Sequence, residues 1–180
     1  GFESFWAVKG TEKTAKNGKW VKGPGMKLIK VFNEVKGDKL IIAEDLGVIT
    51  DGVKKLRDEF ELPGMKVLQF AFDLNEAGKE GFVNAFLPHM YSPNCIVYTG
   101  THDNDTMQGW LNKASDEEIK LICEYIEGPG AYISRDNLCK KLVKLAFSSV
   151  ARFAVIPMQD VFCIGDEGRI NTPSTSDGKN

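Results

Sequence analysis

Acidic side chains recur where buried strands are predicted to end, and a histidine accompanies them. Glu44 and Asp45 directly follow the apolar run Leu40–Ala43, which is continuous rather than alternating, as in a strand buried on both faces. In α/β folds the carboxyl ends of the strands are where the chemistry usually takes place. The full set of candidate residues at predicted strand ends is Glu44, Asp45, Asp73, His102, Asp103 and Asp105.

Several carboxylates and one histidine, without a Ser-His arrangement or a phosphate-binding loop, suit acid/base or oxocarbenium chemistry. In glycoside cleavage one carboxylic acid protonates the leaving oxygen while another carboxylate stabilises or traps the positive sugar. The same carboxylates could instead hold a divalent metal ion or only cap loops, and residue spacing leaves these alternatives open. Asp105 and Thr106 are expected to hold their own loop through bonds to the backbone.

Strands and helices alternate along the chain and would bring these ends to one edge. Apolar runs predict four buried strands, at residues 40–43, 66–72, 95–98 and 153–156. Helices are predicted at residues 26–36, at 51–60, behind the capping box Ser115–Glu118 and after Ser134. This alternation is typical of βαβ units and a parallel sheet, either a small doubly wound sheet or half of an eight-stranded barrel. Residues 74–91 are expected to form a loop.

The composition is that of a globular protein and argues against several classes. The 180 residues are 42% hydrophobic and 27% charged, enough for one domain with a core. The net charge of −2 favours neither nucleic acid nor an anionic membrane as a partner. No apolar run approaches the length of about 20 residues that spans a bilayer. No signal peptide is recognised at the start of the sequence. The four cysteines lack the spacing of metal ligands and are predicted to be reduced core residues of a cytoplasmic protein.

The first 25 residues place aromatic side chains among lysines and predict a long, solvated loop. The chain does not begin with methionine and enters structure at once, so we expect it to be a piece of a longer protein.

Several longer motifs follow one another in a fixed order along the chain. The central ones are Ala-Glu-Asp-Leu-Gly-Val-Ile-Thr at residues 43–50 and Leu-Pro-Gly-Met-Lys-Val-Leu-Gln-Phe at residues 62–70. A third is the stretch from Tyr98 to Thr106, which contains Gly-Thr-His-Asp-Asn-Asp. Further segments lie at residues 1–3, 6–8, 20–25, 149–152, 157–160 and 171–173. Together these segments resemble 4-α-glucanotransferase (amylomaltase, disproportionating enzyme), and the resemblance covers essentially the whole chain.

The resemblance implies a (β/α)₈ TIM barrel of the α-amylase superfamily, of which this chain would be the C-terminal part, about strands 5–8. It implies a retaining double displacement on α-1,4-glucans, with Glu44 as general acid/base and Asp103 as the stabiliser of the transition state. His102 would hydrogen-bond the same sugar. Asp45, Asp73 and Asn171 are the remaining candidates for substrate binding, with Asp45 near the acceptor-side pocket.

The resemblance also implies that the nucleophilic aspartate belongs to a segment immediately before Gly1. The expected partners are α-1,4-glucan and maltooligosaccharide donors and acceptors, with no cofactor, metal, nucleic acid, membrane or obligatory protein partner. Two alternatives stay open: an α-glucan hydrolase of the same superfamily, and a non-catalytic glucan-binding fragment.

Overall fold

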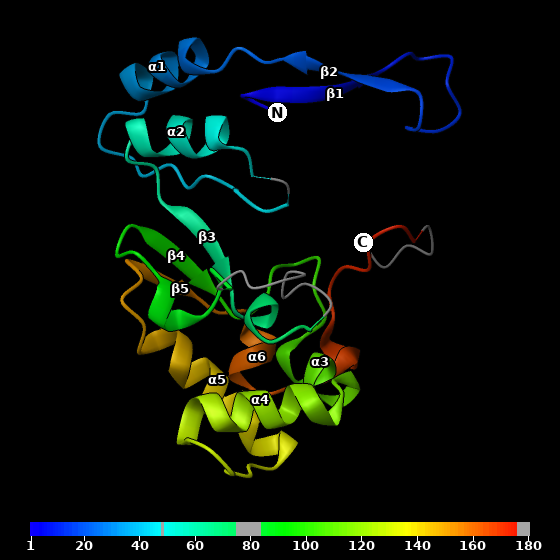
Figure 1. Cartoon of the computed structure of the whole chain (residues 1–180), viewed down its shortest axis with the longest axis vertical. Helices are drawn as coiled ribbons and strands as arrows, with labels where there is room; N and C mark the ends of the chain where they lie inside the picture. The colour runs from blue at the N-terminus through cyan, green and yellow to red at the C-terminus, as the bar shows by residue number, and fades with distance from the viewer. Residues whose placement is uncertain (48, 75–83, 176–180) are drawn as a thin grey trace. The chain divides into compact units, whose positions relative to one another are not determined.

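The computed structural model describes residues 1–47, 49–74 and 84–175, coloured along the chain in Figure 1. The chain divides into two compact units, Gly1–Met65 and Lys66–Asn180. The loop predicted for residues 74–91 falls in part on residues 75–83, which lie outside the described residues.

The first unit opens with a β-hairpin rather than the long loop predicted for residues 1–25. Strands β1 (Ser4–Val8) and β2 (Gly18–Lys22) pair antiparallel. Trp6 lies opposite Trp20, with ring centroids 5.4 Å apart in an edge-to-face arrangement. Such cross-strand aromatic pairs stabilise a two-stranded ribbon. The prediction was wrong because the lysines suggested a solvated loop, whereas Lys19 and Lys22 are exposed positions of strand β2.

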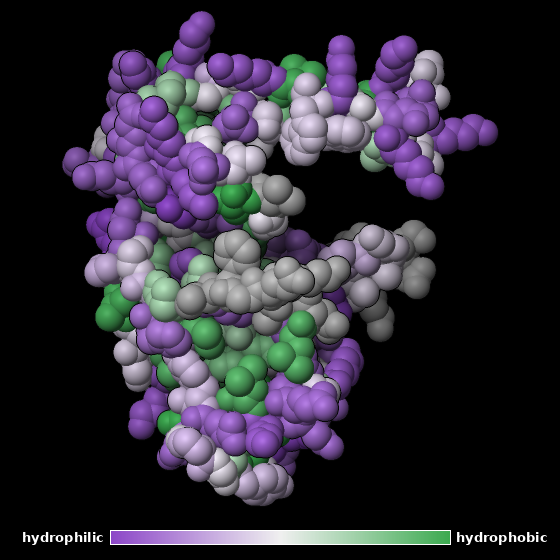
Figure 2. All heavy atoms as spheres, viewed as in Figure 1, coloured by the Kyte–Doolittle hydropathy of each residue, from purple (hydrophilic) through white to green (hydrophobic). Residues whose placement is uncertain are grey.

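Two amphipathic helices follow, close to their predicted bounds. Helix α1 (Met26–Val35) buries Ile29, and helix α2 (Asp51–Glu59) buries Leu56. Thr50 caps α2 by accepting a hydrogen bond from the Val53 amide. Figure 2 shows hydrophilic side chains over the visible faces of both helices, as expected for helices with one buried stripe.

The strand predicted at residues 40–43 is reduced to one residue. Only Ala43 pairs, in an isolated parallel bridge with Gly64, and Leu40 and Ile42 are exposed. The parallel direction agrees with the prediction, but burial on both faces does not. An apolar run becomes a regular strand only where neighbouring strands supply its ladder, and in the described structure Gly64 alone does so.

The sheet associated with the second unit has the strand order β3-β4-β5. It contains β3 (Gly64–Val67), β4 (Cys95–Tyr98) and β5 (Phe153–Val155), and β4 runs parallel to β5. The third predicted strand is confirmed exactly at its bounds. The second is shorter than predicted, because the chain turns into the 3₁₀ helix η1 (Leu68–Ala71), whose residues Leu68, Gln69 and Ala71 are all buried. A short, wholly buried apolar run has no periodicity that separates a strand from a helix.

Three helices cross over between the two parallel strands: α3 (Met107–Lys113), α4 (Asp116–Glu127) and α5 (Arg135–Phe147). The predicted capping box at Ser115 and Glu118 is present at the start of α4. Helix α3 was not predicted. Helix α6 (Met158–Val161) and the 3₁₀ helices η2 (Pro88–Met90) and η3 (Asp166–Gly168) complete the described elements.

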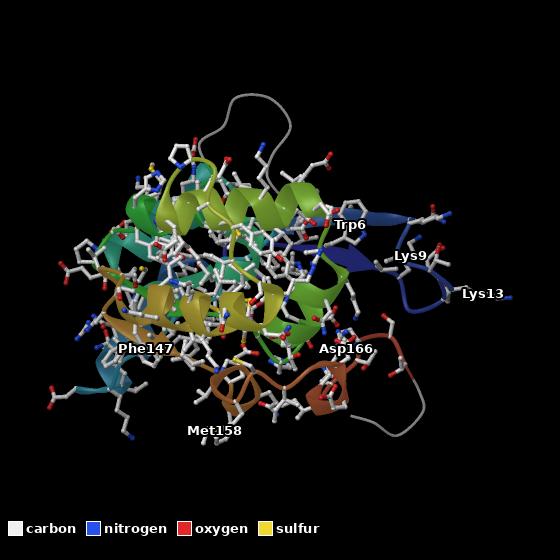
Figure 3. The ribbon with its side chains drawn as sticks, turned by 90° about the horizontal axis from the view of Figure 1, so that it is seen from below. Trp6, Lys9, Lys13, Phe147, Met158 and Asp166 are labelled. Atoms are coloured by element: carbon white, nitrogen blue, oxygen red, sulfur yellow. The ribbon has the colours of Figure 1, made fainter. Side chains whose placement is uncertain are left out.

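The core of this unit lies between one side of β4 and the helices. Cys95 and Val97 of β4 belong to one buried cluster with side chains of α3, α4 and α5, including Leu111, Ile122 and Leu142. Helices α4 and α5 pack on each other, as the view from below shows (Figure 3). Phe147 is exposed at the end of α5.

The cysteines behave as core residues. Cys95, Cys123 and Cys139 are buried, Cys163 is half-buried, and all four are free thiols. Within the described residues, no helix has the length and apolar character needed to cross a membrane.

The two ends of α5 allow a matched test of where the core lies. Leu142→Ala removes a fully buried side chain and is expected to lower the free energy of unfolding by about 2–5 kcal/mol. Phe147→Ala, at a position 62% exposed, should change it by no more than about 0.5 kcal/mol. Chemical denaturation of both variants measures this, and equal losses would contradict the placement of the core.

Candidate functional site

A tight turn presents His102 and Asp103 directly after β4. The Asn104 amide donates to the Thr101 carbonyl (3.2 Å), which closes a four-residue turn with His102 and Asp103 at its centre. The Asn104 side-chain oxygen accepts from both the amide and the hydroxyl of Thr101, each at 2.8 Å. The two central side chains are therefore exposed, at 71% for His102 and 56% for Asp103. The His102 Nε2 atom lies 3.4 Å from the Asp103 Oδ1 atom.

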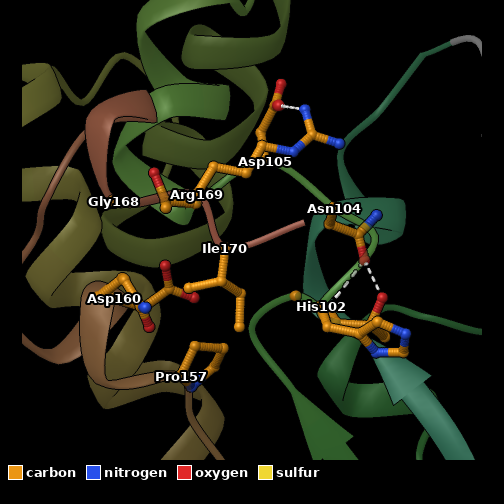
Figure 4. Close-up of a pocket in the computed structure, with 12 residues that line it drawn as sticks. His102, Asn104, Asp105, Pro157, Asp160, Gly168, Arg169 and Ile170 are labelled. Atoms are coloured by element: carbon orange, nitrogen blue, oxygen red, sulfur yellow. Dashed lines mark hydrogen bonds and ion pairs between the residues drawn. The ribbon is translucent and has the colours of Figure 1, made fainter. Parts of the chain in front are cut away.

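The segment after η3 binds this turn from the far end of the sequence. Asn171 Nδ2 donates to Asp103 Oδ1 at 2.5 Å, and Arg169 Nη2 donates to the Asp103 carbonyl at 2.8 Å. Arg169 Nη1 forms an ion pair with Asp105, drawn in Figure 4. The same guanidinium orders its own segment, because Nε donates to the Asn171 carbonyl at 2.8 Å. Of the predicted binding residues, Asn171 thus contacts Asp103 directly.

The start of α3 holds the other side of the loop. Thr106 caps the helix by accepting from the Gly109 amide at 3.0 Å, as the predicted backbone bonding required. Lys113 Nζ lies 3.0 Å from Asp105 and 2.7 Å from Asp166. Hydrogen bonds to these two carboxylates raise the pKa of Lys113 above its ordinary value. Asp105 is therefore shared between a lysine and an arginine.

A buried carboxylate joins the two ends of the loop. Asp160, at 1% exposure, accepts from the Thr99 hydroxyl (2.5 Å) at the end of β4 and from the Met107 amide (2.7 Å) at the start of α3. Desolvation by burial raises the pKa of Asp160, and the hydrogen bonds from Thr99 and Met107 oppose that rise. Asp160 follows the last strand, but it was not among the candidate residues predicted at strand ends.

A small cavity of about 110 Å³ lies between the loop and the C-terminal segment. His102 and Asn104 of the loop line it together with Asp160, Arg169 and Ile170, and in Figure 4 Asp160 lies on the side opposite His102. Gly100 faces a close approach at the edge of the loop, because a Cβ atom there would lie 2.9 Å from the Gln69 side-chain nitrogen. That nitrogen donates to the Asp105 carbonyl at 2.9 Å, so buried Gln69 also supports the loop.

The first unit carries the other pair of candidate carboxylates. Glu44 is exposed, whereas the Asp45 side chain is 7% exposed and accepts from Arg57 Nη1 at 2.6 Å and from the Met65 amide at 2.7 Å. Asp73 lies half-buried after η1 rather than at a strand end. Among the described residues, no group of three or more His, Cys, Asp or Glu side chains could hold a metal ion.

A sequence model of the glycoside hydrolase 77 family, described as 4-alpha-glucanotransferase, matches residues 1–180. The chain belongs to this family. It is 46% identical over 181 residues to a 4-alpha-glucanotransferase of Thermus thermophilus and 45% identical over 180 residues to one of Synechocystis. The alignments cover 99% of this chain but only 35% and 34% of those relatives, so the chain spans about a third of their length. A Solanum tuberosum relative, 45% identical over 178 residues, is described as chloroplastic or amyloplastic, and a cytoplasmic location for this chain stays a prediction.

Solved structures of the 4-alpha-glucanotransferase family have the same fold. The amylomaltase of Streptococcus agalactiae in complex with acarbose superposes with a TM-score of 0.83 at 29% identity, covering 99% of this chain and 34% of that one. The amylomaltase of Corynebacterium glutamicum superposes with a TM-score of 0.70 at 16% identity, covering 96% and 28%, which concerns the fold alone. The resemblance recognised in the sequence is therefore confirmed, while the complete barrel stays a prediction.

Asp160 should make stability depend on pH. Its native pKa lies above the unfolded value of 3.8, so the folded state binds more protons between the two values and its stability falls as the pH rises through that window. Asp160→Asn removes this titration. Denaturant unfolding of both proteins should show the stability of the wild type, relative to the variant, decreasing from pH 4 to pH 7. A difference that grows with pH would contradict the assignment.

Arg169 should contribute to the order of the loop. Arg169→Met removes its bonds to Asp105, to the Asp103 carbonyl and to the Asn171 carbonyl, and is expected to cost about 1–3 kcal/mol of unfolding free energy. Arg152→Met is the control, because the interaction described for the exposed Arg152 side chain is with the face of Phe153, 5.9 Å from the ring centroid, and the bond from its backbone amide to the Cys95 carbonyl is kept. Calorimetry should place the unfolding free energy of the control within about 0.5 kcal/mol of the wild type. Similar losses for both variants would contradict the role of Arg169 in ordering the loop.

Proposed function

We propose that the protein containing this chain is a 4-α-glucanotransferase that moves α-1,4-glucan segments between maltooligosaccharides by a retaining double displacement. The observation that carries the proposal is the family match over all 180 residues. The acarbose complex of the amylomaltase neighbour supports it, because the two chains superpose with a TM-score of 0.83. Because this chain spans about a third of its relatives, the proposal concerns the whole protein.

Glu44 acts in this proposal as the general acid and then as the general base. It gives a proton to the glycosidic oxygen as the bond breaks, and it takes a proton from the acceptor hydroxyl in the second step. Its side chain is exposed, so a sugar can reach it. The nucleophilic carboxylate, which forms the covalent glucosyl ester, is supplied by a part of the protein outside these 180 residues.

Asp103 holds hydroxyl groups of the reacting sugar and stabilises the positive charge of the transition state. Its Oδ1 atom accepts from Asn171, which orients the carboxylate and leaves Oδ2 for the sugar. His102, at the adjacent turn position, donates to the same sugar. In this arrangement Asn171 acts on the sugar through Asp103, and Asp73 is a further candidate for binding.

Incubation of the full-length protein with maltotriose tests the proposal. Transfer converts two maltotriose molecules into maltopentaose and glucose, so longer oligosaccharides should form in step with free glucose. Glu44→Gln and Asp103→Asn should each lower the rate by about 10²–10⁴-fold. Glu34→Gln and Asp136→Asn, at exposed helical positions, serve as charge-matched controls and should keep full activity.

The product pattern separates the alternatives. Glucose and maltose without longer products would indicate an α-glucan hydrolase and contradict the transferase. No turnover by the full-length protein, together with retained glucan binding, would indicate a binding protein.

A further inference from the structure

Asp45 is occupied by protein groups on both of its carboxylate oxygens. Arg57 Nη1 donates to Oδ2 at 2.6 Å, and the Met65 amide donates to Oδ1 at 2.7 Å. Only 7% of the side chain is exposed. A substrate hydroxyl would have to compete with a charged donor and a backbone amide that are already in place.

Arg57 is itself held for this contact. Its Nε and Nη2 atoms lie 2.8 Å and 2.7 Å from Asp58 Oδ1, so a second carboxylate orients the guanidinium on α2. Burial alone would lower the pKa of Arg57, but hydrogen bonds to Asp45 and Asp58 raise it above its ordinary value. The guanidinium is therefore a permanent, oriented cation facing Asp45.

The backbone on the other side of Glu44 is anchored too. The Ala43 amide donates to the Pro63 carbonyl at 2.9 Å, and Ala43 forms the parallel bridge with Gly64. Gly64 approaches so closely that a Cβ atom there would lie 2.3 Å from Asp45 Oδ2. The contact between the two segments therefore requires glycine at this position.

Glu44 is the single residue between these two anchors. The Asp45 side chain is 7% exposed, whereas the neighbouring Glu44 is exposed, so the two adjacent carboxylates lie in different environments. Precise orientation matters for an acid catalyst, because misplacement by about 1 Å can cost about 100-fold in rate.

We propose that Asp45 is a positioning residue, whose ion pair with Arg57 and bond to the Met65 amide fix the backbone that carries Glu44, and that it does not contact the glucan. This inference rests on the proposed role of Glu44 as acid/base. It replaces the expectation of a sugar contact for Asp45 with an action through Glu44.

The test compares Asp45→Asn and Arg57→Lys in the full-length protein, on maltotriose and on α-glucosyl fluoride. Fluoride departs without a proton, so the first turnover on that substrate does not need a well-placed acid. Both variants should lower kcat on maltotriose about ten-fold or more with KM changed less than about two-fold. The first-turnover burst of fluoride should stay within about three-fold of the wild type. Arg57→Lys keeps the positive charge but loses the planar fork of the guanidinium. Arg57→Gln loses both, so its activity should fall further than that of Arg57→Lys.

Glu59→Gln is the matched control, because it removes a carboxylate at an exposed position of the same helix α2. It should keep kcat on maltotriose within about two-fold. Rates are normalised to the folded fraction from circular dichroism, which removes any loss due to misfolding. Glu44→Gln is measured in parallel and should show the same selective loss on maltotriose.

Three outcomes would overturn the positioning role. A large rise in KM with unchanged kcat would make Asp45 a sugar contact. Equal losses on both substrates would make the pair a structural feature only, and unchanged kinetics of Asp45→Asn would remove any role. If Glu44→Gln itself keeps full activity on maltotriose, the proposed function fails, and the positioning role fails with it.

Discussion

The second unit depends on a carboxylate that has been removed from water. Asp160 accepts from a hydroxyl at the end of β4 and from an amide at the start of α3, and thereby fixes the span of the loop between them. A buried charge is costly unless its hydrogen bonds are satisfied, and in this case both oxygens have partners. The Thr101–Asn104 turn is built within that span. His102 and Asp103 are exposed at the centre of this turn, in a loop whose two ends are joined by Asp160.

In each unit, charged partners hold an acidic residue that lies close in sequence to a proposed catalytic carboxylate. In the first, Arg57 and a backbone amide hold Asp45 beside Glu44. In the second, Arg169 and Lys113 hold Asp105, two positions after Asp103. In both cases a neighbouring acidic residue takes the ion pair, and the proposed catalytic carboxylate stays exposed. Arginine suits this work because its planar fork binds two or more oxygens at once.

Local signals in the sequence were sufficient where local interactions decide the structure. The Ser115–Glu118 box predicted a helix start, because a cap involves residues three apart. Strand β4 was predicted exactly, and three of its four residues are buried. Residues 40–43 looked similar but lack a ladder beyond Ala43, and a single sequence does not reveal which partner is present. The β1–β2 hairpin was not predicted, because its lysines suggested a solvated loop.

The candidate site shows the same division. The strand-end rule selected Glu44, Asp45 and the His102–Asp103 pair as candidates, and the roles that the family motif implies for them stay predictions. Neither the strand-end rule nor the family motif could locate Arg169, which contacts Asp105 across 64 positions and lies in a polar segment without periodicity. The sequence also does not show that Asp45 faces Arg57 rather than solvent, because Glu44 and Asp45 are both carboxylates at adjacent positions. Which residues form long-range ion pairs depends on how the folded chain packs.

The bond between Asn171 and Asp103 joins residues 68 positions apart, and this separation has a consequence during biosynthesis. At about 5–20 residues per second, roughly 3–14 seconds pass between the addition of Asp103 and that of Asn171. The bond that orients the Asp103 carboxylate can therefore form only after β5 and Asp160 have been added to the chain as well.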